Sequence, residues 1–103
     1  MTTGIGTFEF AAPLWRYPSP DGWYFISLPA DVSGEINDMT VGIRRGFGSV
    51  RVVAKVGASS WRTSIFPDSK NGTFLLPVKK AVRLAEHLDA GGRVRLRLQI
   101  ADL

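Results

Sequence analysis

Between Gly72 and Ile100 the spacing of the apolar residues changes from a helical period to a period of two. In the first part apolar residues recur at intervals of three or four, which predicts a helix over about residues 78–89. Pro77 fits the start of this helix because its missing N–H would have no partner there, and Gly91 with Gly92 fits its end. The expected apolar stripe contains Val78, Ala81, Val82, Ala85 and Leu88. The expected polar face contains Lys79, Lys80, Arg83, Glu86 and His87.

The segment after these glycines alternates strictly between apolar and polar residues, which predicts a strand with one buried face. We expect the core to receive Val94, Leu96, Leu98 and Ile100. We expect the solvent face to present Arg93, Arg95, Arg97 and Gln99. The helix and this strand must then pack on a sheet that the rest of the chain supplies.

Five earlier segments have the alternation or the aromatic and β-branched composition of strands. They are residues 7–15, 23–28, 50–56, 61–66 and 73–76. Turn-forming residues separate them, and a helical turn capped by Asp31 or Ser33 is expected over residues 30–36. One helix cannot cover a large open sheet of six strands, whereas closure into a barrel removes the exposed edges.

We therefore predict a single domain over residues 1–103, of a size that supports one core. Its fold class is mainly β: a small closed or partly closed antiparallel barrel of about six strands. One α-helix, over about residues 78–89, lies between the last two strands.

The composition excludes several kinds of site. The chain has no cysteine and one histidine, so disulfides, thiolate metal sites and a typical transition-metal centre are not expected. No run approaches the roughly 20 apolar residues that span a bilayer, and the signal-peptide pattern is missing. We expect a cytoplasmic protein without a cofactor or a membrane contact, and its oligomeric state cannot be read from the residues.

The net charge of +4 is unevenly distributed along the chain. Residues 1–43 contain one basic and five acidic residues, whereas residues 44–103 contain twelve basic and four acidic ones. The two halves therefore carry −4 and +8. This asymmetry favours an anionic partner for the second half. The alternative is that the halves interleave in the fold, so that their surface charges partly cancel.

An ordered set of short motifs resembles a small bacterial family, domain of unknown function nineteen-oh-five. The motifs are Trp23-x-Phe25-x-x-Leu28-Pro29, Gly48-x-Val50-x-Val52, Gly57-x-x-x-Trp61-x-x-Ser64 and Leu76-Pro77-Val78-Lys79. The resemblance covers residues 7–100 and implies a small β-barrel with a helix. Members occur alone or fused to a YdeI/OmpD-associated, bacteriocin-protection domain. The family supplies no catalytic residues to carry over.

Residues 72–98 are also similar to the half-barrel unit of AbrB/MazE-type regulators, which form intertwined dimers that bind DNA. The similarity rests on Leu76-Pro77, a basic helix with Arg83, then Gly91-Gly92 and the alternating residues after it. Gly92 stands where that pattern usually has an aspartate, and the chain is about twice the length of the unit. The similarity implies shared geometry more than shared function.

The second half also contains the residues that we expect to bind a ligand. Arg62, Ser64, Lys79, Arg83 and Trp61 combine cations with an aromatic ring and are the candidates for a ligand or anion site. Trp15, Tyr17, Trp23 and Tyr24 are expected near them. The opposing interpretation places Trp61, Trp23 and the phenylalanines in the core.

Two other function classes stay open. Arg93, Arg95, Arg97 and Lys80 would neutralise phosphates of a nucleic acid without reading its bases, or simply keep a barrel exterior soluble. A small hydrolase would require a pocket that joins Ser64 or His87 to a carboxylate. We expect a non-enzymatic binding or interaction module, with an anionic ligand or a protein as its partner.

Overall fold

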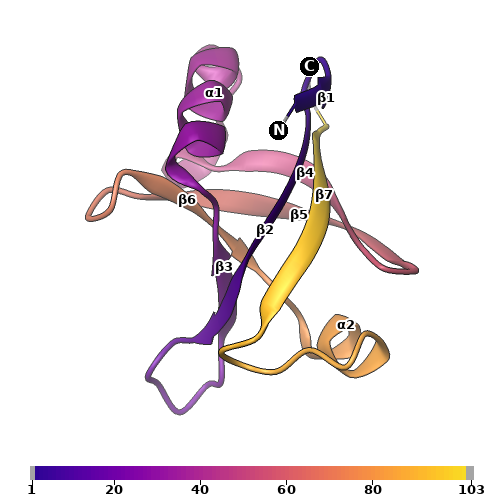
Figure 1. Cartoon of the computed structure of the whole chain (residues 1–103). Coiled ribbons are helices and arrows are strands. Elements are labelled where there is room, and N and C mark those ends of the chain that lie inside the picture. The colour runs from indigo at the N-terminus through magenta and orange to yellow at the C-terminus, as the bar shows by residue number, and fades with distance from the viewer. Residues whose placement is uncertain (1, 102–103) are drawn as a thin grey trace.

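The computed structural model of the chain describes residues 2–101 (Figure 1). The strands are β1 (Thr2–Gly4), β2 (Thr7–Arg16), β3 (Tyr24–Ser27), β4 (Val50–Val56), β5 (Ser59–Asp68), β6 (Thr73–Pro77) and β7 (Arg93–Ile100). The helices are α1 (Ala30–Thr40), a short 3-10 turn η1 (Gly46–Gly48) and α2 (Lys80–Ala85).

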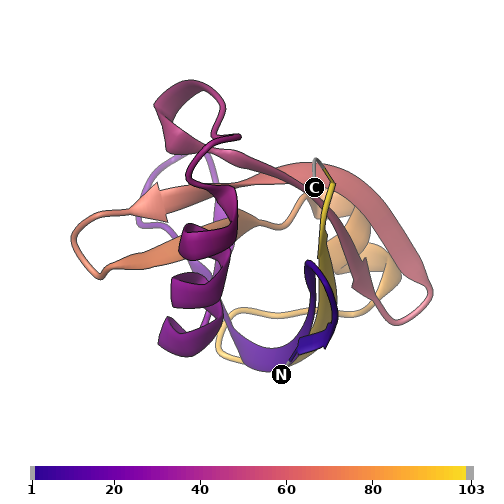
Figure 2. The ribbon, with the colours of Figure 1, turned by 90° about the horizontal axis from the view of Figure 1, so that it is seen from above.

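Six of these strands close into an antiparallel barrel in the order β2, β3, β6, β5, β4 and β7. The ring closes where β7 pairs with β2, from Thr7 opposite Gln99 to Pro13 opposite Arg93. Figure 2 shows the strands as a ring, with α1 lying across it. The predicted fold, a closed antiparallel barrel of six strands with a helix between the last two, is confirmed.

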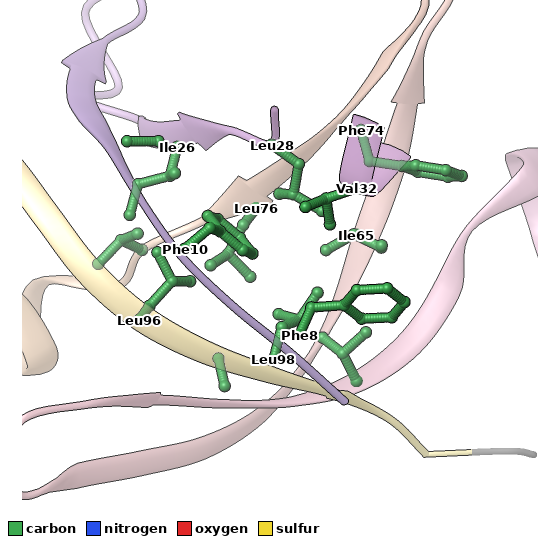
Figure 3. Packing of buried hydrophobic residues seen from close by; sticks show 14 of the residues in the cluster. Phe8, Phe10, Ile26, Leu28, Val32, Ile65, Phe74, Leu76, Leu96 and Leu98 are labelled. Carbon is green, nitrogen blue, oxygen red and sulfur yellow. The ribbon is translucent and has the colours of Figure 1, made fainter. Parts of the chain in front are cut away.

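The core lies inside the ring and follows the alternation of the strands (Figure 3). Phe8 and Leu98 are both fully buried and stand opposite each other where β2 meets β7. The even-numbered residues from Val94 to Ile100 are buried, and Arg93, Arg95 and Arg97 are exposed. The predicted orientation of the last strand is therefore confirmed.

Helix α1 extends four residues beyond the helical turn expected at 30–36 and covers one end of the barrel (Figure 1). Its buried face consists of Val32, Ser33, Ile36 and Thr40. Ser33 Oγ accepts a hydrogen bond of 3.1 Å from the backbone N–H of Phe74 in β6. Two of the four buried residues are polar, so the apolar stripe was too sparse to predict the full helix. The N-cap position is held by Pro29 and not by Asp31 or Ser33, but Asp31 Oδ1 accepts a 2.9 Å hydrogen bond from the backbone N–H of Val32 in the first turn.

Helix α2 is shorter than the predicted 78–89 and spans only Lys80–Ala85. Pro77 is the last residue of β6 rather than the first of the helix. Val82 is buried, as the predicted stripe requires, but Ala81 and Ala85 are exposed. Val78 and Leu88, which flank the short helix, are buried and partly buried, so the stripe reaches the core at Val78, Val82 and Leu88.

The end of α2 is set by His87 and not by the two glycines. His87 has a φ of 55°, and the N–H of Leu88 bonds to the carbonyl of Arg83 at 2.9 Å. A left-handed residue followed by this bond is a common helix stop, normally built on glycine. Gly91 and Gly92 instead bond to the backbone of Leu14 and continue toward β7. The predicted place of His87 on a helix face is thus wrong.

The β4–β5 hairpin turns on Gly57 and Ala58, and Gly57 has a φ of 56°. The hairpin is fastened to the end of α2, because Ser59 Oγ donates a 2.6 Å hydrogen bond to the carboxylate of Glu86. A Cβ built on Gly57 would lie 2.1 Å from Glu86 Oε1. The site therefore requires glycine for its backbone angle and for its contact.

We expect Gly57→Ala to lower the free energy of unfolding by about 1–2 kcal/mol, from the left-handed backbone and the displaced Glu86 carboxylate. Gly34→Ala is the matched control, because Gly34 lies in α1 with open space around it. That change is expected to raise stability by about 0.5–1 kcal/mol. Urea unfolding curves of both variants give the change in the free energy of unfolding for each. A Gly57→Ala variant that is more stable than the native protein would contradict the prediction.

Candidate functional site

A pocket of about 750 Å³ opens between β5 and the segment that joins β6 to α2. Its walls include Trp61 to Ser64 on β5 and Pro77 to Lys80 on the opposite side, with Arg83 of α2 beside them. Asp21 to Tyr24 add a third wall from the β2–β3 connection. A concavity of this volume is in the range that small-molecule and peptide ligands occupy.

Pro77 explains why the pocket exists. Strands β5 and β6 pair from Asp68 opposite Thr73 to Phe66 opposite Leu75. Two positions further in this register Ser64 would stand opposite Pro77, which has no N–H to donate. The pairing of β5 with β6 ends at Phe66 and Leu75, and β6 then runs away from β5 toward α2 (Figure 1). The two strands diverge, and the pocket occupies the gap.

The electrostatics of the pocket are dominated by cations. Its lining contains Arg51, Arg62, Lys79, Lys80 and Arg83. Among the described residues 2–101, the carboxylate in the lining is that of Asp21. None of the five cations forms an ion pair with another residue of the described range 2–101. Their charges are therefore available to an anionic group that enters the pocket.

Arg83 is held in place by two contacts. Its guanidinium carbon lies 3.7 Å from the centre of the Tyr24 ring, and its Nε donates a hydrogen bond of 3.2 Å to the carbonyl oxygen of Val78. Stacking on an aromatic face suits the planar guanidinium better than a lysine ammonium. The two terminal nitrogens of Arg83 remain as donors for a carboxylate or a phosphate.

Aromatic side chains supply the apolar part of the lining. Trp61 is 8% exposed, so it belongs to the core and also forms part of the pocket wall. Trp23 is 54% exposed and Phe66 is 39% exposed, which overturns their expected place in the core. Phe47 is exposed as well. Trp23 and Phe47 lie outside the strands, and Phe66 follows the buried Ile65 in β5, so the alternation of that strand turns it outward.

Two of the aromatic residues expected near Trp61 lie elsewhere. Trp23 and Tyr24 line the pocket, whereas Trp15 and Tyr17 do not. Trp15 packs against Phe25 with ring centres 5.3 Å apart, and Trp23 stacks on the same Phe25 at 6.2 Å. Trp15 also donates an indole hydrogen bond to Ser27 Oγ. The outer face of β2 and β3 thus carries its own aromatic cluster, continuous with the pocket through Trp23.

The structure brings Trp61, Arg62, Ser64, Lys79 and Arg83 together around this one pocket. Their role in binding stays a prediction. Arg51 also lines the pocket, opposite Ser64 in the hairpin register, and the sequence reading missed it. A two-residue turn at Gly57-Ala58 would have revealed that register, but we expected a longer turn through Ser60.

The residues of the nucleic-acid hypothesis are divided between two places. Arg93, Arg95 and Arg97 form a row on the outer face of β7, and Lys80 lies at the pocket. In the strand register Arg97 has Lys55 of β4 on one side and Glu9 of β2 on the other. The row is therefore cationic but bordered by a carboxylate at one end.

Of the residues of the hydrolase hypothesis, Ser64 and one carboxylate, that of Asp21, line the same pocket, and His87 does not line it. The hydrolase class stays an untested alternative. Within residues 2–101 no group of three or more His, Asp or Glu residues is placed to hold a metal ion. In the same range neither α-helix has the length and apolar character that crossing a membrane requires.

Comparison with known proteins gives one family. The family model of DUF1905, described as a domain of unknown function, matches residues 10–98. No curated protein matches the chain.

Proposed function

The chain belongs to the DUF1905 family of domains of unknown function, and we propose that it is a non-enzymatic, cytoplasmic binding module. Its ligand is an anion with an apolar part, held in the pocket between β5 and α2. The observation that carries this proposal is the lining of the pocket: five cations without ion-pair partners in the described chain, next to aromatic rings.

Each part of the lining has a defined task in this proposal. Arg83, fixed on Tyr24, presents its terminal nitrogens to the anionic group. Lys79 and Arg62, from opposite walls, add charge without fixed geometry. Trp61 and Phe66 contact the apolar part of the ligand, where removal of water from flat surfaces supplies affinity. Hydrogen bonds to charged groups are the stronger ones, so the anion should dominate.

A pair of fluorescent probes tests the proposal. Anilinonaphthalenesulfonate carries a sulfonate on a flat ring system, and phenylnaphthylamine has the same rings without the charge. We expect the native protein to bind the sulfonate at least about tenfold more tightly, because a charge-assisted hydrogen bond contributes roughly 1.5–3 kcal/mol. Fluorescence titration gives both affinities. Backbone NMR shifts must place the sulfonate probe at Arg62, Ser64 and Arg83.

Two results would count against this function. Equal affinity for the two probes would show that the cations of the pocket do not contribute to binding. Shifts confined to the outer aromatic cluster of Trp15 and Phe25 would place the binding site elsewhere.

A second candidate function is contact with a nucleic-acid backbone, which the row of Arg93, Arg95 and Arg97 favours. Residues at alternate strand positions stand about 7 Å apart on one face, close to the spacing of phosphates along a strand. Such binding should weaken steeply between about 50 and 200 mM salt. An oligonucleotide that shows no anisotropy change at the lower salt concentration would remove this candidate.

A further inference from the structure

The part of the pocket between β5 and the β6–α2 segment follows the edge of β5, and the lining extends past β5 to Arg51 and Val52 of β4. Trp61, Arg62, Thr63 and Ser64 are consecutive, and all four line the pocket. Side chains alternate between the faces of a strand, so a cavity above one face would touch only every second residue. A cavity lined by consecutive residues instead lies beside the strand, where the backbone N–H and C=O groups point.

The hairpin register shows which backbone groups point there. Val56 and Ser59 flank the two-residue turn and therefore exchange hydrogen bonds with each other. From Ser59 onward, every second residue of β5 points its backbone N–H and C=O groups toward β4. The backbone groups of Arg62 and Ser64, which lie between these residues, point away from β4. That other edge faces the pocket. In the described part of the chain, pairing along this edge covers Phe66 to Asp68 and does not extend back to Ser64.

The opposite wall is also extended. Pro77, Val78, Lys79 and Lys80 are consecutive lining residues, and Lys79 has the φ and ψ of a strand, −70° and 157°. This part of the pocket is thus a slot between β5 and the segment that leads from the end of β6 at Pro77 to the start of α2 at Lys80. Its length along Trp61 to Ser64 is about four residues, or roughly 13 Å at 3.3 Å per residue.

A slot of this kind matches the backbone of another extended chain. The edge of a strand offers N–H donors and C=O acceptors in turn, and a peptide offers the same series in return. A phosphate or a small carboxylate would use the donors and leave the carbonyl groups of Arg62 and Ser64 without partners. Among the described residues the lining has five cations and the carboxylate of Asp21, and this surplus of positive charge selects a peptide that carries acidic side chains.

We propose that the pocket binds an extended acidic peptide segment as an added strand along the free edge of β5. The inference rests on the proposed function and names the class of its anionic ligand. Residues directly opposite each other on paired strands share a face. Acidic side chains of the peptide therefore lie on the face of Arg62, and the alternating apolar side chains lie on the face of Trp61.

Three synthetic peptides test the inference on the native protein. The first is a blocked peptide of about six residues in which Glu and Val alternate, long enough to cover the slot. The second has the same sequence with N-methylated backbone amides, which keeps every charge and removes every backbone donor. The third has the same composition with all Glu residues before all Val residues. We expect the alternating peptide to bind at least about tenfold more tightly than either control.

Amide hydrogen exchange supplies a second readout that charge attraction alone would not change. The amide of Arg62 should exchange at least about tenfold more slowly when the alternating peptide is saturating. Equal binding of the N-methylated peptide, no binding of the alternating peptide, or an unchanged exchange rate at Arg62 would each overturn strand addition.

The sulfonate probe distinguishes a failure of strand addition from a failure of anion binding in the pocket. If the peptide tests fail while the sulfonate still binds at Arg83, the pocket takes a small anion and only strand addition is wrong. If the sulfonate also fails to bind there, the proposed function falls with it. A peptide-independent dimer, detected by sedimentation, would show that the free edge pairs with a second copy instead, which also overturns the inference.

Discussion

Replacing Phe8 by alanine is expected to lower the free energy of unfolding by about 3–5 kcal/mol. Phe8 is fully buried in β2 and stands opposite Leu98 of β7, where the barrel closes. The change removes most of a large apolar side chain and leaves a cavity that the two strands cannot fill without losing their register. A domain of this size has about 5–15 kcal/mol of stability in total, so the loss is a large fraction of it.

The matched control is Phe47→Ala, which makes the same chemical change on the surface. Phe47 is 96% exposed in the turn η1, and its removal should alter stability by less than about 0.5 kcal/mol. Urea unfolding monitored by tryptophan fluorescence measures both variants. Similar midpoints for the two would show that the β2–β7 seam is not part of the cooperative core.

Replacing Arg83 by glutamine is expected to weaken binding of the sulfonate probe by about ten- to a hundredfold, with little change in affinity for the uncharged probe. The guanidinium is fixed over Tyr24 and has no carboxylate partner in the described chain, so its charge is available to the ligand. Arg83→Lys keeps the charge but loses the planar stacking and the fork of donors. Its affinity should fall between those of the native protein and Arg83→Gln.

Arg95→Gln is the charge-matched control, because Arg95 is exposed on β7 and does not line the pocket. It should leave the affinity for the sulfonate within about twofold of the native value at physiological salt, where charges beyond the Debye length are screened. An equal loss in Arg83→Gln and Arg95→Gln would mean that the probe senses only net charge. The pocket would then have no special role.

The sequence predicted the barrel well where burial follows alternation. In β7 every second residue is both apolar and buried, so the pattern encoded the strand and its orientation together. Helix α1 was only partly predicted, because Ser33 and Thr40 occupy buried positions through hydrogen bonds rather than through apolarity. Helix α2 was predicted too long, since His87 takes a backbone angle that residue type alone does not reveal.

The sequence predicted which side chains form the candidate site, but it did not predict the shape of the pocket that they line. Clustering of cations near Trp61 in the sequence identified five side chains that line one pocket. Arg51 was missed because its place depends on the hairpin register, and Asp21 because it arrives from a distant loop. The slot itself depends on Pro77 and on the divergence of two strands, which is a property of the tertiary fold.

The seam between β2 and β7 also determines when this protein can fold during its synthesis. The first long strand finds its partner in the last one, so a nascent chain on the ribosome holds Phe8 and Phe10 without their neighbours until β7 has emerged. Pairings this distant in sequence form slowly, after the local hairpins. We therefore expect the chain to expose apolar surface and an unpaired edge of β2 until β7 is available, which favours aggregation during folding.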